Sequence, residues 1–397
     1  MFSLRKSVVY GGFLAVLCMI HSPSFAQKPA PPPPIYYHIQ YFTGPGGSDP
    51  AIRAMNNSGV MVGDYSHNGG TRGFLYDPAI DPSEAIDLND VVDLTGIVAI
   101  PADWVISYAV DVNDRGALLA TIEKVAQRDV SQPDFERHGV VIDRRQIPWT
   151  TMLLPDAASH VSMGIHINNN GDVLGGFVQP GDDVYGPAGA YLYNVGLYRE
   201  TGPDPTLSIL PVTLRQRSHA NLNDPVPGYP LRVVGVNPDG NVFRYTVGDE
   251  TPLDVFALVI NSDKPGINGY GVFCGRTRVR KTKGSQYVSR PFWFDPDLYS
   301  SPTFIGSESA QAGQIASDIN DHGDVVLNDY LYRNGKLLAI DNLVTGAYGD
   351  YWRTHWAGVQ YCTQRTDNGY PLLSGGVSNE TGGHWGVLLT PRTTPQP

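Results

Sequence analysis

The chain has 397 residues, of which 41% are hydrophobic and 17% are charged, and its formal net charge is −11. An acidic chain of this kind lacks the basic footprint of a nucleic-acid-binding protein, and its charge also opposes docking on anionic lipid. The 44 glycines and 32 prolines, together with the lack of helical periodicity, favour a fold made of short strands and turns.

The first 26 residues are typical of a secretory signal peptide. Arg5 and Lys6 precede an apolar stretch, Val8 to Ile20, that is too short to cross a bilayer, and Ser24-Phe25-Ala26 supplies the small residues of a cleavage site. We expect cleavage near Ala26, which leaves a mature chain of net charge −13, and a secreted or periplasmic location. An uncleaved anchor is the alternative. Residues 27–35 form a Pro-rich, extended linker, and no later apolar run predicts a membrane span.

A short phrase, Asn followed by two variable residues and Gly, recurs along the rest of the chain. Gly59, Gly116 and Gly171 end its first three copies at spacings of 57 and 55 residues. The next clear copy ends at Gly323, 152 residues later, which leaves room for two degenerate copies at a spacing of about 51. Asn and Gly in this order favour a tight hairpin, because both tolerate left-handed backbone.

The two degenerate copies and the last one complete a count of seven. One degenerate copy runs through Ala220-Asn221-Leu222-Asn223-Asp224, and the other is placed at Val259-Ile260-Asn261. The last copy is Thr366-Asp367-Asn368-Gly369. A period of about fifty residues repeated seven times indicates a repeat architecture.

Each copy predicts four short strands. The first ends at the Asn phrase, the second follows it, the third is aromatic, as in Gly73-Phe74-Leu75-Tyr76, and the fourth often ends in Asp-Leu. This pattern predicts an all-β fold, a seven-bladed β-propeller of four-stranded blades over residues 36–393, with a tail at 394–397. A β-helix and stacked sandwiches are the alternatives, but the copies are too long and too rich in loops for β-helix coils.

The two ends of the repeat region are complementary. The seventh copy stops after its third strand, at Val387-Leu388-Leu389-Thr390, whereas an unassigned strand, residues 36–42, precedes the first copy. We therefore predict that the N-terminal strand completes the last blade, which closes the ring and removes an exposed edge.

The phrase, the strand before it and the aromatic strand after it resemble the HAF repeat, a family of predicted extracellular repeats in secreted bacterial proteins. The resemblance covers about residues 36 to 392, and the first and third copies match best. The His-Ala-Phe triplet of the family is not intact: Arg72-Gly73-Phe74 and Gly189-Ala190-Tyr191 stand in its place. The resemblance implies a secreted, propeller-like bacterial protein and brings no settled biochemical activity with it.

Motifs for catalysis and for metals are weak. The sequence has no Gly-x-Ser-x-Gly elbow, no paired metal histidines and no phosphate-binding loop, so we predict no catalytic residue, no metal site and no cofactor. Calcium is the one weakly supported ion, because Asp318, Asn320, Asp321 and Asp324 surround one Gly turn. Asn and Asp are expected at a hairpin in any case.

Two cysteines remain after Cys18 leaves with the signal. An oxidising compartment permits a disulfide between Cys274 and Cys362, and two buried thiols are the alternative.

The alignment of the copies predicts a candidate ligand-binding rim. The loops that lead into the innermost strands of a propeller share one face, and here they bring together aromatic, imidazole and guanidinium groups suited to a sugar or a peptide. The candidate residues are Trp104, His160, His219, Trp352, Arg353, His355 and Trp356. The alternative is that the tryptophans fill gaps between blades and the histidines are solvated.

One basic run, Arg276 to Lys283, stands out in the acidic chain. Its alternation with Thr and Val predicts an exposed hairpin, either a solvated loop between the second and third strands or a docking site for an acidic partner.

The sequence therefore favours a secreted binding or interaction scaffold for an extracellular carbohydrate or protein ligand. A hydrolase or lyase acting on polysaccharide or peptide at the channel mouth is the alternative, and a surface protein that oligomerises through blade edges is a third possibility. The sequence does not fix the ligand or the oligomeric state.

Overall fold

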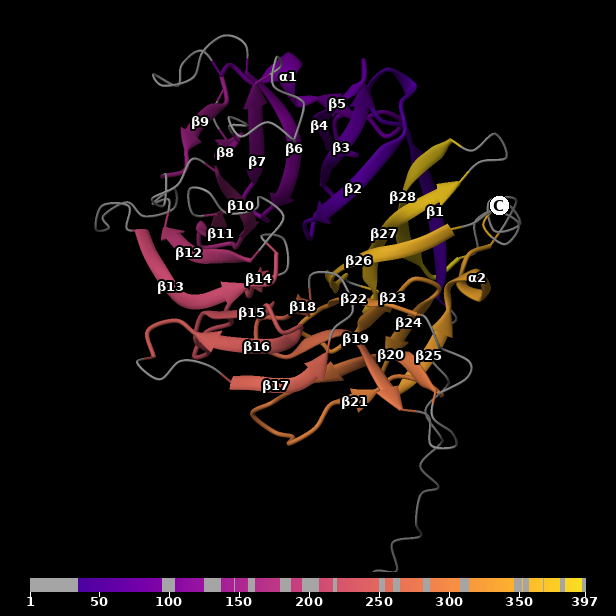
Figure 1. The fold of residues 1–397 in the computed structure, drawn as a ribbon. Coiled ribbons are helices and arrows are strands. Elements are labelled where there is room, and N and C mark those ends of the chain that lie inside the picture. Colours follow the sequence, from indigo (N-terminus) through magenta and orange to yellow (C-terminus); the bar gives the residue numbers. More distant parts are fainter. Residues whose placement is uncertain are drawn as a thin grey trace, which may run out of the picture. The chain divides into compact units, whose positions relative to one another are not determined.

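Antiparallel strands account for nearly all regular structure in the described part of the chain. The computed structural model describes residues 35–394 except for 95–103, 125–136, 146, 156–160, 179–186, 195–206, 217–219, 250–253, 260–264, 281–285, 308–313, 346–351, 353–356, 367 and 379–382. The strands form seven four-stranded blades arranged in a ring, a seven-bladed β-propeller as predicted (Figure 1).

The first three complete blades follow one another along the chain, each from its innermost to its outermost strand. Blade 1 is β2 (Pro50–Met55), β3 (Met61–His67), β4 (Gly70–Tyr76) and β5 (Ile86–Asp87). Blade 2 is β6 (Trp104–Val112), β7 (Ala117–Lys124), β8 (Arg137–Asp143) and β9 (Thr150–Leu153). Blade 3 is β10 (Val161–Ile167), β11 (Asp172–Val178), β12 (Ala188–Asn194) and β13 (Leu207–Leu214). One parallel pair, Val161 with Arg137, joins blades 2 and 3 into a single sheet.

The remaining blades repeat this order. Blade 4 is β14 (Ala220–Leu222), β15 (Arg232–Val236), β16 (Asn241–Thr246) and β17 (Asp254–Val259). Blade 5 is β18 (Gly266–Ile267), β19 (Phe273–Arg280), β20 (Tyr287–Phe294) and β21 (Thr303–Phe304). Blade 6 is β22 (Ala316–Ile319), β23 (Val325–Leu327), β24 (Tyr330–Arg333) and β25 (Lys336–Ala339). Blade 7 is β26 (Ala357–Arg365), β27 (Pro371–Ser378) and β28 (His384–Arg392), with β1 (Tyr36–Phe42) as its outermost strand.

The ring closes through the first strand of the chain, as the sequence predicts. β1 pairs with β28 in an antiparallel register that runs from Tyr36 opposite Arg392 to Phe42 opposite Gly386. The buried Tyr37 hydroxyl donates to the Pro371 carbonyl at 3.0 Å, which ties β1 to the blade beyond the backbone ladder. This pairing satisfies the edge that β28 would otherwise expose.

The repeated aromatic of the third strand packs on a repeated glycine of the second. Gly63 lies opposite Phe74, and Gly175 lies opposite Tyr191. A Cβ atom on Gly175 would stand 2.0 Å from the Tyr191 ring, so only glycine leaves room for the aromatic side chain. This contact explains why the glycine of the second strand and the aromatic residue of the third strand recur together.

The Asn phrase forms the hairpin between the first and second strands of a blade. In blade 3 the Asn168 Oδ1 accepts the backbone N–H groups of Asn170 and Asp172 at 3.0 and 2.9 Å, and Gly171 has a positive φ of 79°. One predicted copy is placed wrongly: the hairpin of blade 5 starts at Asn268, and Val259 belongs to β17 of the preceding blade. The phrase is intact there as Asn268-Gly269-Tyr270-Gly271, but the strand before it, β18, has only two residues.

The basic run also differs from the loop favoured by the sequence. Arg276, Arg278 and Arg280 lie within strand β19, whereas Lys281 and Lys283 fall outside the described residues.

Helical structure is minor. The short helices α1 (Leu88–Val91) and α2 (Ile340–Leu343) follow the outermost strands of blades 1 and 6, and a 3₁₀ turn, η1 (Pro45–Gly47), follows β1. Among the described residues, no helix is long and apolar enough to cross a membrane.

Candidate functional site

The innermost strands end at a circle of amide side chains that links neighbouring blades. We call it the Asn ring; its members are Asn56, Asn113, Asn168, Asn223, Asn268 and Asn320, with Thr363 in blade 7. Each Asn Nδ2 donates to a backbone carbonyl of the next blade, for example from Asn56 to Asn113 at 3.1 Å and from Asn320 to Thr363 at 3.0 Å. The repeated Asn is therefore more than a hairpin residue, because it also bonds one blade to the next.

A second circle lies one residue further along each turn. We call it the turn ring; its members are Asn57, Asp114, Asn169, Asp224, Gly269, Asp321 and Gln364. The N–H of one member donates to the side-chain oxygen of the next, as from Asn57 to Asp114 at 2.7 Å, and the circle closes from Gln364 back to Asn57 at 2.7 Å. Gly269 has no side chain, and at that junction the Asn223 Nδ2 bonds the Gly269 carbonyl at 3.2 Å. Every junction between blades thus carries at least one of these bonds.

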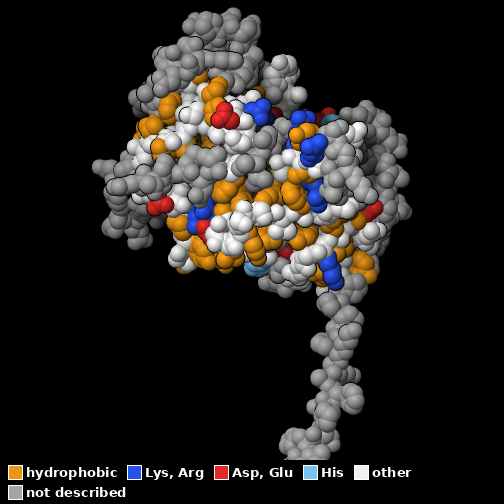
Figure 2. All heavy atoms as spheres, turned by 60° about the horizontal axis from the view of Figure 1, so that its bottom comes forward, with side chains coloured by type: hydrophobic (Ala, Val, Ile, Leu, Met, Phe, Trp, Pro, Cys, Tyr) orange, Lys and Arg blue, Asp and Glu red, His pale blue; other side chains and the backbone are white. Residues whose placement is uncertain are grey.

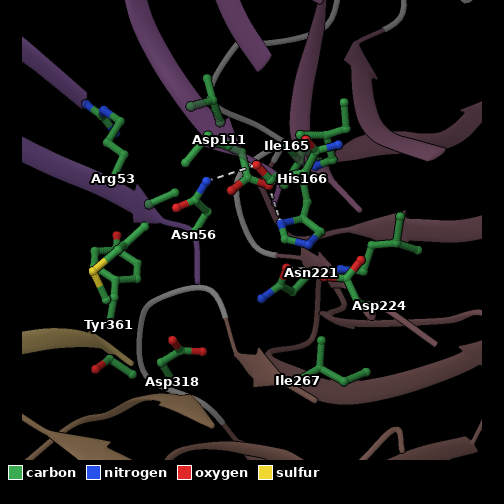
Figure 3. A pocket seen from close by; sticks show the side chains of 18 of the residues that line it. Arg53, Asn56, Asp111, Ile165, His166, Asn221, Asp224, Ile267, Asp318 and Tyr361 are labelled. Atoms are coloured by element: carbon green, nitrogen blue, oxygen red, sulfur yellow. Dashed lines mark hydrogen bonds and ion pairs between the residues drawn. The ribbon is translucent and has the colours of Figure 1, made fainter. Parts of the chain in front are cut away.

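A cavity of about 950 Å³ lies at the centre of the ring, and the innermost strands of all seven blades line it. Its polar wall is built at the position two residues before the Asn ring, where the chain places Asp111, His166, Asn221, Asp318 and Tyr361. Figure 3 shows Asp111, His166, Asn221 and Asp224 gathered along one side of the cavity, with Asp318 and Tyr361 on another. We call these six residues the cavity group.

A backbone irregularity orients this wall. The strand register shifts between Gly164 and His166 in β10, between Ala109 and Asp111 in β6, and between Ala316 and Asp318 in β22. Each shift is a bulge that leaves one residue unpaired, and bulges re-aim the side chains that follow them. The residue after the bulge is a member of the cavity group in each of the three strands.

One imidazole and one carboxylate form the central pair of the cavity. His166 Nδ1 contacts Asp111 Oδ2, and the same carboxylate oxygen accepts the backbone N–H of Ile167 at 2.8 Å. A carboxylate on one ring nitrogen fixes the orientation of the imidazole, which leaves the other nitrogen to bind a polar group. Asp318 plays a similar bridging part between blades 6 and 7, since its Oδ2 accepts the Cys362 N–H at 3.0 Å.

Two carboxyl groups and one phenol at the cavity have raised pKa values. Desolvation by the surrounding protein raises the pKa of the Asp224 carboxyl from 3.8 to about 6. The negative charges of Asp114 and Asp111 act in the same direction, and the hydrogen bond from the Asn169 N–H opposes them. Burial likewise raises the pKa of the Asp321 carboxyl and, together with Asp318, the pKa of the Tyr361 hydroxyl. The cavity therefore holds a carboxyl group that changes its charge near neutral pH.

A further group of side chains at the cavity wall is already engaged with partners. The Tyr108 ring lies between the guanidinium groups of Arg53 and Arg137, at 5.0 and 5.5 Å from its centroid. Arg53 also pairs with Asp64, and Arg137 pairs with Glu123 at 3.1 Å. Both cations are therefore neutralised, and the Tyr108 faces are covered by them.

Stability should depend on pH through Asp224. Its folded-state pKa of about 6 lies above the ordinary value, so the folded chain binds more protons than the unfolded chain between about pH 4 and 6. The contribution of Asp224 to the free energy of unfolding is therefore highest at low pH and is lost as the pH rises through about 6. We expect Asp224→Asn to flatten this slope in urea titrations between about pH 4 and 7.

Asp239→Asn, which removes a carboxylate from an exposed turn in blade 4, is the matched control. Equal slopes for wild type and Asp224→Asn would contradict the prediction.

The structure places two of the predicted rim residues, and both lie in the hydrophobic core. Trp104 is 8% exposed at the start of β6, where its ring packs 5.1 Å from that of His138. Trp352 is 6% exposed and packs in the core of blades 6 and 7 with Tyr37 and Val359. The other five, His160, His219, Arg353, His355 and Trp356, lie outside the described residues, so the rim stays a prediction.

Sequence reasoning missed the cavity group, although a usable signal was present. Innermost strands of a propeller are mostly apolar, yet polar residues stand two places before the Asn phrase in several copies: Asp111, His166, Asn221 and Asp318. A polar residue repeated at a buried strand position is a stronger indication of a site than the composition of a loop.

The predicted calcium ligands are engaged with the protein itself. Asp321 Oδ1 accepts the Gly269 N–H at 2.6 Å, and Asp324 Oδ2 accepts from Asn320 Nδ2 at 3.1 Å. Within the described residues, no group of three or more acidic, histidine or cysteine side chains has a geometry suited to a metal ion.

Cys274 and Cys362 are both buried free thiols in the structure, which agrees with the alternative of two thiols and not with a disulfide. Burial raises the pKa of both Cys274 and Cys362 well above the ordinary range, which leaves them inert as nucleophiles.

Neither a known sequence family nor a curated protein matches the chain. The resemblance to HAF repeats therefore rests on the residues alone.

Several solved structures are similar to the chain at low identity. They include a puromycin hydrolase mutant (14% identity, TM-score 0.46, covering 88% of this chain and 52% of that one). A sialidase from Trypanosoma rangeli in complex with the inhibitor DANA is also similar, with 12% identity and a TM-score of 0.38 over 86% of this chain and 54% of that one. A fucose-specific lectin from Aleuria aurantia has 10% identity and a TM-score of 0.33 over 91% of this chain and 97% of that one. The chain spans about half the length of the hydrolase. At these identities and scores, the likeness carries no argument about activity.

Proposed function

We propose that this protein is a secreted binding scaffold with HAF-type repeats, whose central cavity holds a polar extracellular ligand, most suitably a carbohydrate. The observation that supports it is the cavity itself, of about 950 Å³, into which the cavity group presents carboxylate, imidazole, amide and phenol groups. This volume lies in the range of pockets that bury small ligands. Mixed donors and acceptors at fixed positions suit the hydroxyl groups of a sugar.

Hydrogen bonds between neighbouring blades hold the strand ends that form the walls of the cavity. The Asn ring and the turn ring fix the ends of the innermost strands, so the cavity group is held before a ligand arrives. A site that is already in its bound geometry loses less conformational entropy on binding. An extracellular protein can use such a site without any bound cofactor.

Obstruction of the cavity is the direct test. Gln360 lines the cavity from β26 and is exposed there, so Gln360→Trp should fill the space without removing a ring bond. On a glycan and peptide array, we expect Gln360→Trp to reduce the binding of the mature protein at least about tenfold.

Lys336→Trp, which adds the same bulk at an exposed position of β25, is the matched control. Unchanged binding by the Gln360 variant would move the ligand site elsewhere. Trp352→Ala is unsuitable for this purpose, since Trp352 packs in the core and its loss would destabilise the blade.

A second candidate function is an enzyme, and one observation favours it. The His166–Asp111 pair stands in the same cavity as Asp224, a carboxyl group with a pKa of about 6, so an oriented base and a protonable acid face one space. Hydrolysis or elimination on a polysaccharide or peptide would use both. Release of products from a polysaccharide and peptide panel by wild type, and its loss in His166→Gln, would support the enzyme; binding without turnover would exclude it for the panel.

A further inference from the structure

Blade 5 carries a two-stranded ribbon that extends beyond the other two strands of the blade. β19 and β20 pair over eight residues, from Phe273 opposite Phe294 to Arg280 opposite Tyr287. In contrast, β18 pairs with β19 only at Cys274 and Phe273, and β21 pairs with β20 only at Phe292 and Trp293. Beyond the Arg276–Pro291 pair, where the Ile305 N–H still bonds the Pro291 carbonyl at 2.9 Å, no described strand of blade 5 flanks the ribbon.

The two faces of this ribbon differ in character. Successive side chains of a strand point to opposite faces, and residues directly opposite in an antiparallel pair share a face. Arg276, Arg278 and Arg280 therefore lie on one face with Ser289 and Tyr287. The other face carries Thr277, which is buried, Val279 and Val288, which are partly buried, and Arg290, whose guanidinium donates to the Gly306 carbonyl at 2.8 Å.

The arginine face is open to solvent at its outer end. Arg278 and Arg280 are exposed, and Tyr287 is 67% exposed. In the part of the chain that the structure describes, neither Arg278 nor Arg280 has an acidic partner, unlike Arg232 and Arg244, which both pair with Asp297 at 2.8 Å. Figure 2 brings the β17 and β21 side of the molecule forward, and several Lys and Arg side chains lie on its right half.

We propose that the face formed by Arg278, Arg280 and Tyr287 is a docking surface for an acidic polysaccharide that bears carboxylate or sulfate groups along its chain. Alternate residues of a strand are about 7 Å apart, so the guanidinium groups form a row of cations that matches a linear polyanion. Guanidinium groups bind carboxylate and sulfate oxygens through paired N–H donors. The exposed Tyr287 ring on the same face offers an apolar surface for a sugar ring.

The charge of the whole chain favours a polysaccharide over nucleic acid. The net charge of −11 repels any polyanion, and the repulsion grows with the charge density of the partner. Duplex DNA carries about one charge per 1.7 Å, whereas a polyuronate carries one carboxylate per sugar ring. A short row of cations can therefore offset the repulsion more readily for the polysaccharide.

The test measures binding of the full mature protein to a sulfated polysaccharide, a polyuronate, neutral dextran and duplex DNA at low salt. We expect binding to the two acidic polysaccharides, none to dextran, and weaker binding to DNA. Arg278→Gln combined with Arg280→Gln should reduce affinity for the acidic polysaccharides about tenfold, and added salt should do the same to wild type.

The matched control removes two positive charges elsewhere. Arg215→Gln combined with Arg392→Gln changes exposed residues of blades 3 and 7 and should leave affinity within about twofold. Equal losses of affinity in the two double variants would show that net charge alone accounts for the binding, and would overturn the proposal. Absence of binding by wild type, or tighter binding to DNA than to the polysaccharides, would also overturn it. Gln360→Trp should retain this binding, so that failure of the cavity site and failure of the ribbon are distinguishable.

Discussion

Phe42→Ala should lower the free energy of unfolding by about 3–5 kcal/mol. Phe42 is 1% exposed and ends β1, where its ring stacks on Tyr76 of blade 1 with centroids 3.8 Å apart. It also fills the space above Gly386, since a Cβ at that glycine would lie 2.1 Å from the Phe42 ring. One side chain thus packs the closing strand of blade 7 against the first blade. Urea denaturation followed by circular dichroism measures the loss.

Leu298→Ala provides the control, because Leu298 is 73% exposed on blade 5. We expect its unfolding free energy to stay within about 0.5 kcal/mol of wild type. A Phe42→Ala protein as stable as the Leu298→Ala protein would show that the closing strand contributes little to the ring.

Asn168→Ala should lower the free energy of unfolding by about 3–4 kcal/mol, because it removes hydrogen bonds within blade 3 and to blade 4. The side chain of Asn168 is fully buried; its Oδ1 accepts two N–H groups, and its Nδ2 donates to Asp172 at 3.1 Å and to Asn223 at 3.4 Å. Alanine would leave these buried groups without partners. Asn168→Asp keeps the hydrogen-bond acceptor and loses the donor. We expect its carboxylate, which would face the Asn223 carbonyl, to lower the free energy of unfolding further.

The same hairpin supplies the control for this substitution. Asn170 is exposed two residues away, and Asn170→Ala should change the unfolding free energy by less than about 0.5 kcal/mol. Comparable losses at both positions would mean that the hairpin turn, and not the bond between blades, accounts for the effect of Asn168.

The fold could be predicted from the sequence because its signals are local and repeated seven times. The Asn phrase marks most of the hairpins, and an aromatic strand marks most of the third strands, although β8 of blade 2 contains no Phe, Trp or Tyr. The unmatched strand at residues 36–42 indicates how the ring closes. The hairpin of blade 5 was placed at Asn261, seven positions before the phrase that starts at Asn268 and follows the two-residue strand β18.

The site could not be predicted in the same way, because it depends on contacts between blades. The bonds of the Asn ring join residues 43 to 57 positions apart, and a local pattern cannot show which carbonyl an Asn side chain reaches. Loop composition drew attention to Trp104 and Trp352, which the fold uses in its core. The polar residues two places before each Asn, such as His166, carry the site instead.

Closure by β1 also sets the order in which the protein can be completed during synthesis. The His38 ring bonds the Thr394 carbonyl at 2.8 Å across 356 positions, so the first strand made waits for the last one. At about 5–20 residues per second, this delay lasts roughly 20–70 s. Until then, blade 7 has no outer strand and β1 has an unpaired edge, which makes this interval the one in which a growing chain most needs protection from pairing with a neighbour.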